Sequence, residues 1–181
     1  MLKPSQILVD EHVQILKVIS ALNHECHVLS AKKPIDKKFF SDSIDFIRNF
    51  ADKFHHAKEE KIFFVEFCNN AHKAHCNPVE QMLAEHEMGR GYVKELENAL
   101  QTENMREIMD NSLLYANLLK AHIHKEDTIF YPMADEIFDQ KTQDEIAEKF
   151  SKVEKEFGED FINKYISFAN EAEKRKNNTI Q

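Results

Sequence analysis

The chain has 181 residues and a formal net charge of −8, and it is long enough for one domain with its own core. Glycine and proline number only 3 and 4, which excludes β-sandwich and βαβ folds, because these need many turns. Charged residues make up 31% and hydrophobic residues 42%, a composition typical of amphipathic helices and too apolar for a disordered chain. The acidic, well-mixed charge argues against partners such as nucleic acid or an anionic membrane.

Targeting signals and disulfides are not predicted. No run of about 18 apolar residues indicates a transmembrane helix, and the first residues, MLKPSQILVDEH, become polar too early for a signal peptide. We therefore expect a cytoplasmic protein. Its three cysteines, Cys26, Cys68 and Cys76, have no zinc-type spacing and are interpreted as reduced thiols.

Hydrophobic periodicity predicts five helices, at about residues 4–30, 36–70, 78–101, 103–138 and 142–174. Asp36 and Asn77 are the expected N-caps of the second and third helices, and Glu80 completes a capping box in the third. Pro132 predicts a kink in the fourth helix. The final residues, NNTIQ, are expected to fray.

Short loops between long helices favour antiparallel neighbours. The predicted fold is therefore all-α, with an up-down-up-down four-helix bundle in residues 1–140 and an additional C-terminal helix. We expect residues 141–181 to form that helix, packed on the bundle, and the frayed tail. Pairing of the C-terminal helix with a second subunit, which would make a homodimer, is the alternative expectation.

Two stretches of the chain resemble each other, HHAKEEKIFF in the second helix and HIHKEDTIFY in the fourth. Both carry H-x-x-x-E, and residues i and i+4 of a helix lie on one face. His55 and Glu59 therefore form one two-residue metal-binding pair. His122 and Glu126 form a second. Helical periodicity places His55 on the core face of its helix and His56 on the solvent face.

The first and third helices each offer one histidine on the core face, His12 and His86. At about 1.5 Å per residue, these histidines and those of the two pairs lie within roughly one helical turn of a common level. A buried carboxylate is costly unless it is paired or coordinated, so this set predicts a cation site. Imidazole and carboxylate ligands favour iron, zinc or manganese over calcium or magnesium, and each glutamate would bridge two ions.

This pattern in an antiparallel bundle resembles the hemerythrin-like (HHE cation-binding) family over roughly residues 5–138. The resemblance implies a non-haem di-iron centre, two iron ions joined by an Fe–O–Fe or Fe–OH–Fe bridge, with zinc or manganese as substitutes. It assigns the metal ligands to His12, His55, Glu59, His86, His122 and Glu126. Members of the family include oxygen carriers and sensors, proteins tied to nitrosative stress and iron–sulfur repair, and iron sensors.

Two features depart from the family pattern. Oxygen-carrying members have H-x-x-x-H on the third helix, whereas Arg90 occupies the second position here, which argues against a simple carrier. The first H-x-x-x-E pair lacks the proline that follows the second, so a kink is expected on one side only. Gly89 and Gly91 predict a ligand path, a π-bulge or close helix packing. Tyr115 is expected either to hydrogen-bond near the metals or simply to pack.

The leading expectation is a di-iron protein that binds or reacts with O₂, peroxide or NO in sensing, storage or stress protection. One alternative is a catalytic di-iron peroxidase or oxidase, and whether the protein is an enzyme is left open. Two others are an iron store or donor for the repair of iron sites and a metal-free helical interaction module. No separate site for an organic substrate is visible in the sequence, and the electron donor is not identified.

Overall fold

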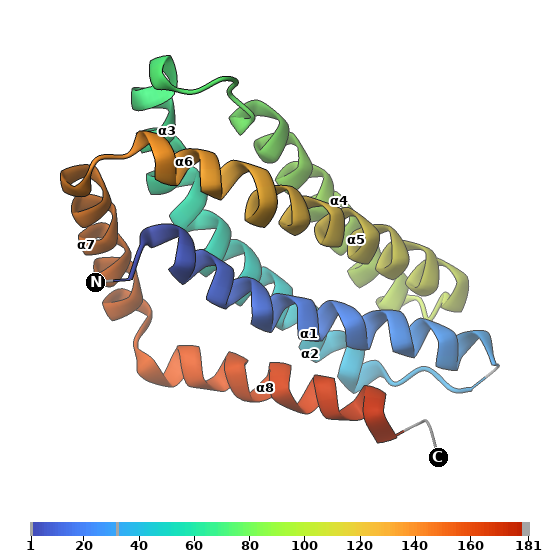
Figure 1. Ribbon diagram of the computed structural model, residues 1–181. Coiled ribbons are helices and arrows are strands. Elements are labelled where there is room, and N and C mark those ends of the chain that lie inside the picture. The colour runs from blue at the N-terminus through green and yellow to red at the C-terminus, as the bar shows by residue number, and fades with distance from the viewer. Residues whose placement is uncertain (1, 32, 179–181) are drawn as a thin grey trace.

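The structure is a computed structural model that describes residues 2–31 and 33–178. Within these two ranges the chain forms helices joined by short loops and no strand, which confirms the all-α class (Figure 1). Across the described residues, no helix combines the length and the apolar composition needed to span a membrane. Residues 179–181 of the expected frayed tail lie outside the described part of the chain.

The elements follow the predicted segments closely. In chain order, the first half contains α1 Pro4–Ser30, α2 Lys37–Phe46, the π-helical segments η1 Ile47–His56 and η2 Glu59–Phe63, α3 Phe64–Asn70 and the 3₁₀ turn η3 Ala71–Lys73. The second half contains α4 Val79–Gln101, α5 Met105–Lys125, the π-helical segment η4 Glu126–Phe130, α6 Tyr131–Ile137, α7 Gln140–Phe157 and α8 Glu159–Asn178.

Asp36 is the N-cap of α2 as expected, whereas the N-cap of α4 is Pro78, one residue after the expected Asn77. The Asp36 side chain accepts a hydrogen bond from the backbone N–H of Phe39 at 3.0 Å, at the start of α2. The Asn77 side chain accepts one from the backbone N–H of Val79 at 3.1 Å, at the start of α4. These bonds satisfy backbone donors that a helix start leaves without a partner.

The second and fourth helical segments each contain a π-helical turn at the same place. The turns η2 and η4 begin at Glu59 and Glu126, the two glutamates of the H-x-x-x-E pairs. Only η4 is followed by a proline, Pro132, so the π-helical turn forms with and without one, and the kink expected on one side only stays a prediction. A π-bulge beside Gly89 is absent, because α4 is α-helical over its whole length.

The core consists of two hydrophobic clusters, one toward each end of the helices. Along α1, Leu8 belongs to one cluster and Ile15 to the other, and His12 lies between them. Helix α4 packs along α5, and α1 packs against α5 and α8. The candidate histidines therefore occupy a polar layer between two apolar ones.

The C-terminal region contains two helices, so the expectation of one continuous helix over residues 142–174 is wrong. Helices α7 and α8 meet at Gly158, which has φ 83° and ψ 158°, a conformation that residues with a side chain rarely adopt. The chain turns at this glycine. Helix α8 then runs along α1, while α7 packs near η2 at the end of the molecule where α1 begins (Figure 1).

Replacing Gly158 by alanine tests whether this turn depends on glycine. A Cβ at this position meets no atom within 4 Å, so the only cost is backbone strain. We expect Gly158→Ala to lower the free energy of unfolding in urea by about 1–3 kcal/mol. Gly91→Ala is the control, because Gly91 lies in the interior of α4 and an added Cβ there also has no atom within 4 Å, so it should be neutral or stabilising. Equal effects of the two substitutions would contradict this account.

Candidate metal centre

The six residues expected as ligands lie together in the interior of the protein. Each is at most 2% exposed: His12, His55, Glu59, His86, His122 and Glu126. They come from four stretches of the chain that are far apart in the sequence: α1, η1 with η2, α4, and α5 with η4. Burial of so many polar side chains is costly unless the groups satisfy one another or bind an ion.

The four histidines form two pairs. The rings of His12 and His55 have centroids 4.6 Å apart. In the other pair, Nε2 of His86 and Nε2 of His122 are 2.9 Å apart. Two imidazole nitrogens bound at right angles to one ion, at about 2.1 Å each, would lie about 3 Å apart. The second pair therefore has the spacing expected of two ligands of one ion.

Glu59 lies between one histidine of each pair. Its Oε2 atom is 3.7 Å from Nε2 of His55 and 3.5 Å from Nε2 of His86, and it has no hydrogen-bond partner. Its Oε1 atom accepts a hydrogen bond from the hydroxyl of Tyr131. Burial, together with the neighbouring carboxylate of the second H-x-x-x-E pair, raises the pKa of Glu59 well above its ordinary value.

Glu126 has the equivalent place between the other two histidines. Its Oε2 atom is 3.4 Å from Nε2 of His12 and 3.2 Å from Nε2 of His122. Neither of its oxygens has a hydrogen-bond partner. In the aligned stretches Phe64 corresponds to Tyr131, so Glu126 receives no matching phenol hydrogen bond. Each glutamate thus lies where it can bridge the two histidine pairs.

The outer nitrogen of every histidine in these pairs faces a carboxylate from a neighbouring helical segment. Measured from Nδ1, the partners are Asp127 for His12 at 2.8 Å, Glu11 for His55 at 2.8 Å, Glu60 for His86 at 2.7 Å and Glu85 for His122 at 2.8 Å. Such bonds hold the proton on Nδ1 and leave the lone pair of Nε2 directed inward. Metal-binding histidines are commonly oriented in this way.

The sequence interpretation did not single out these four acids. A signal was nevertheless present, since each lies directly beside a candidate ligand in the sequence, in Glu11-His12, Glu59-Glu60, Glu85-His86 and Glu126-Asp127. Two of the outer acids are bound in turn by a lysine: Lys58 donates to Glu11, and Lys125 donates to Glu85. The contacts around the two histidine pairs therefore form a twofold-like pattern.

His56 lies in the interior and is 6% exposed, so the expectation that it faces solvent is wrong. The segment that carries it is π-helical, and its wider turns rotate successive residues less, so that His55 and His56 both face inward. A nitrogen of His56 lies within 4.8 Å of ligand nitrogens of His86 and His122. Its ring, however, stacks on that of His86 with 12° between the planes. Lone pairs in parallel planes do not converge on one ion, so His56 is a neighbour of the centre.

Arg90, four residues after His86, supports one of the outer acids. Its Nη2 atom donates to Asp52 at 2.6 Å and to Glu60 at 2.7 Å. Burial acts to raise the pKa of Glu60, but the bonds from His86 and Arg90 outweigh it and lower the pKa to about 2. Arg90 therefore keeps the partner of His86 ionised.

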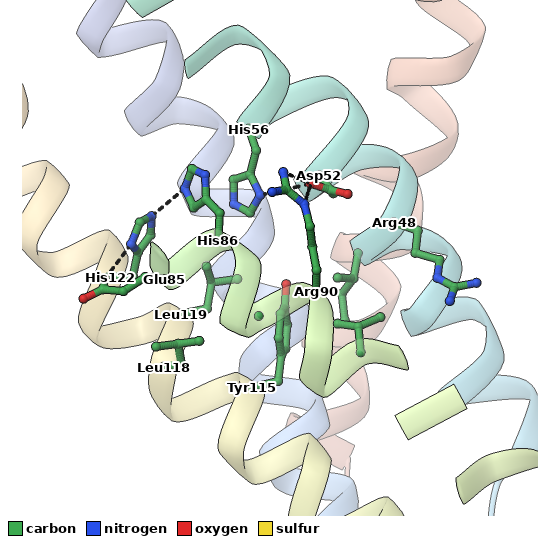
Figure 2. A pocket seen from close by; sticks show the side chains of 13 residues that line it. Arg48, Asp52, His56, Glu85, His86, Arg90, Tyr115, Leu118, Leu119 and His122 are labelled. Atoms are coloured by element: carbon green, nitrogen blue, oxygen red, sulfur yellow. Dashed lines mark hydrogen bonds and ion pairs between the residues drawn. The ribbon is translucent and has the colours of Figure 1, made fainter. Parts of the chain in front are cut away.

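A cavity of about 180 Å³ borders one histidine pair. His86, His122 and His56 line its inner end, and the ring of Tyr115 lines its side (Figure 2). Gly89 also belongs to its lining. Neither residue of the His12–His55 pair lines it. A Cβ on Gly89 would lie 3.5 Å from the ring of Tyr115, an ordinary van der Waals contact. Gly89 thus borders both the cavity and α5, so a ligand path and close helix packing both remain predictions for it.

The donor set fits a pair of transition-metal ions. Buried acceptors without donors are rare in folded proteins, and here Glu59 and Glu126 together present three such oxygens. The inward nitrogens of His86 and His122 would repel each other at 2.9 Å unless a proton or a cation lay between them. Imidazole nitrogen and carboxylate oxygen are ligands that suit iron, zinc and manganese.

The metal-free protein should lose stability as the pH rises through the titration of His12. Burial lowers the pKa of His12, but its contacts with Asp127 and Glu126 outweigh burial and raise it from 6.5 to about 9. The bound proton therefore stabilises the fold fully below pH 6.5, and this contribution is lost as the pH rises through 9. After chelation we expect urea unfolding to show a loss of about 3 kcal/mol across that window.

Asp127→Asn should reduce this loss, because it removes the ionised partner of His12. Glu136→Gln, at an exposed position of α6, should retain the wild-type dependence on pH. The same pH dependence in Asp127→Asn and the wild type would show that the bond to Asp127 does not control the protonation of His12.

Comparison with known families agrees with this geometry. A family model described as the Hemerythrin HHE cation binding domain matches residues 3–134, which contain all six buried candidate ligands and their four outer acids. No curated protein and no solved structure gives a significant match. The match covers well over half of the chain. The chain therefore belongs to the hemerythrin HHE cation-binding domain family.

Proposed function

We propose that this chain is a di-iron protein with a hemerythrin-type four-helix bundle, which binds or reacts with O₂, peroxide or NO. The observation that carries the proposal is the position of two buried carboxylates, Glu59 and Glu126, each between one histidine of each pair. One ion would satisfy one histidine pair. Two ions, shared by both glutamates, satisfy both pairs and all three orphaned oxygens.

In this proposal the ligand roles follow from the geometry of the side chains. The terminal ligands are the inward nitrogens of His12, His55, His86 and His122. Glu59 and Glu126 are the bridging ligands. Two irons held in this way would supply electrons to, and an open position for, a small oxidant.

The rest of the chain orients and shields these ligands. The four outer acids hold the histidine rings in place and increase the basicity of their inward nitrogens. The hydroxyl of Tyr131 fixes one oxygen of Glu59 and leaves the other free to bridge. Aromatic rings cover the centre on the side of the hydrophobic cluster that contains Leu8, where Phe63, Phe64 and Phe130 are each at most 2% exposed. These rings exclude water from that side.

A catalytic role, as a di-iron peroxidase or oxidase, is the second candidate. The cavity beside His86 and His122 favours it, because a ligand bound there has room to be exchanged. Stopped-flow spectroscopy separates the two roles. A lasting adduct with NO or O₂ supports binding and sensing, while repeated consumption of peroxide in the presence of a reductant supports catalysis.

Metal analysis of the purified protein tests the proposal directly. We expect about two irons per chain, with an absorption spectrum that changes on exposure to air. Glu126→Gln and His86→Ala should each reduce the content to one ion or fewer, because each removes a ligand atom from the centre. His24→Ala is the control, since His24 lies on α1 away from the six residues and should leave the metal content unchanged.

Two results would contradict the proposal. One is a metal content that the ligand substitutions leave unchanged, which would indicate metal bound elsewhere. The other is a single tightly held zinc ion, which would indicate a structural site with closed coordination.

A further inference from the structure

The surroundings of the metal centre are less symmetric than the centre itself. Each histidine has an acid on its outer nitrogen and a glutamate beside its inner one. The cavity of about 180 Å³, by contrast, is lined by His86 and His122 and not by His12 or His55. The two ends of the centre therefore differ in the space that they offer to an incoming molecule.

The two ends also differ at one pair of equivalent sequence positions. His12 and His86 hold equivalent places. Each directly follows a glutamate in the sequence, and each binds an acid that directly follows a proposed bridging glutamate: Asp127 for His12 and Glu60 for His86. Three residues after His12 lies Ile15, which is 1% exposed and packs in the core. Three residues after His86 lies Gly89, which has no side chain and lines the cavity. A buried side chain therefore occupies this position in α1, and none occupies it in α4, beside the cavity.

The outer side of the His12–His55 pair is also covered by α7. Lys58, which donates to the acid that holds His55, is 0% exposed and lies under α7. Its amino group is 5.3 Å from the ring centroid of Phe150 and 3.6 Å from Glu154, both of which belong to α7. The corresponding side chain at the other pair, Lys125, is 31% exposed. Access is thus restricted at one end and available at the other.

The lining of the cavity indicates the chemistry of its occupant. Two arginines line it, and both are already paired: Arg90 with Asp52 and Arg48 with Glu97. The cavity therefore offers no unpaired cation that would favour an anion. The hydroxyl of Tyr115 is buried and has no hydrogen-bond partner, and it points toward the end of the cavity where His56 and Asp52 lie (Figure 2). A buried donor without an acceptor favours a ligand that supplies one.

We propose that exogenous ligands reach the metal centre at its His86–His122 end, through this cavity, and that the cavity admits small uncharged molecules with a hydrogen-bond acceptor. Gly89 sets the size of ligand that passes, and the hydroxyl of Tyr115 donates to the ligand once it is bound. This inference rests on the proposed function, because it concerns ligands of the same centre. It goes further in assigning one end of the centre, and two named residues, to ligand entry and retention.

Matched substitutions at the two glycines of α4 test this route. Gly89→Leu fills the cavity, and Gly91→Leu places the same side chain at an exposed position of the same helix with open space around it. Gly89→Ala is the milder variant, since its Cβ makes only ordinary contacts with Tyr115. Xenon serves as an uncharged probe that requires no metal, and NO serves as the ligand of the iron-loaded protein. Metal content and circular dichroism are measured for every variant.

We expect xenon to occupy the cavity in crystals of the wild type and of Gly91→Leu, and to be absent from Gly89→Leu. The association rate of NO should fall about tenfold or more in Gly89→Leu, by less in Gly89→Ala and not at all in Gly91→Leu. Tyr115→Phe should leave the xenon site intact and weaken NO binding about fivefold, the effect of one lost hydrogen bond.

An unchanged rate of NO association in a folded, iron-loaded Gly89→Leu or Gly89→Ala protein would overturn the route. Absence of xenon from the wild-type cavity would do so as well. Unchanged NO affinity in Tyr115→Phe would overturn the role given to its hydroxyl. Failure of the proposed function is distinct, because it would appear as a wild-type protein that holds no iron pair, whatever the xenon result.

Discussion

The structure depends on a layer of charge and hydrogen bonding in the middle of an apolar core. Glu59 and Glu126 are fully buried, and three of their four oxygens receive no hydrogen bond from the protein. Each lies between the inward Nε2 atoms of two histidines, and the outer Nδ1 atom of each of these histidines is bound to an acid. Burial of these groups without cations would be costly, since the desolvation of an uncompensated carboxylate opposes folding. The fold and this polar layer are therefore one energetic unit.

Much of this could be predicted from the sequence. The low glycine and proline content, the periodicity and the caps predicted the helices, and the repeated H-x-x-x-E with two further core histidines identified the six residues that the structure brings together. The inward position of His56 could not be predicted with the α-helical period, because η1 is π-helical. The turn at Gly158 was missed, since a lone glycine within a helical pattern is often tolerated. The outer acids were missed because each contacts a histidine of another helical segment. The periodicity of a single helix does not show such a contact.

The two histidine pairs are supported by the same kinds of side chains, but the surroundings of the two pairs differ. Helix α7, which ends at the turn at Gly158, covers the side of Lys58 with Phe150. On the other side Gly89 leaves a cavity against the ring of Tyr115. Arg90 acts through Glu60 on the orientation of His86. The pattern of histidines and carboxylates is thus symmetric, while the space around them is not.

Anomalous X-ray diffraction at the iron absorption edge, on crystals of the iron-loaded protein, tests the central claim most directly. The account predicts two anomalous peaks a few Å apart, one beside His12 and His55 and the other beside His86 and His122, with Glu59 and Glu126 reaching both. A single peak, or peaks that the two glutamates do not share, would contradict the claim that a pair of cations compensates these buried carboxylates.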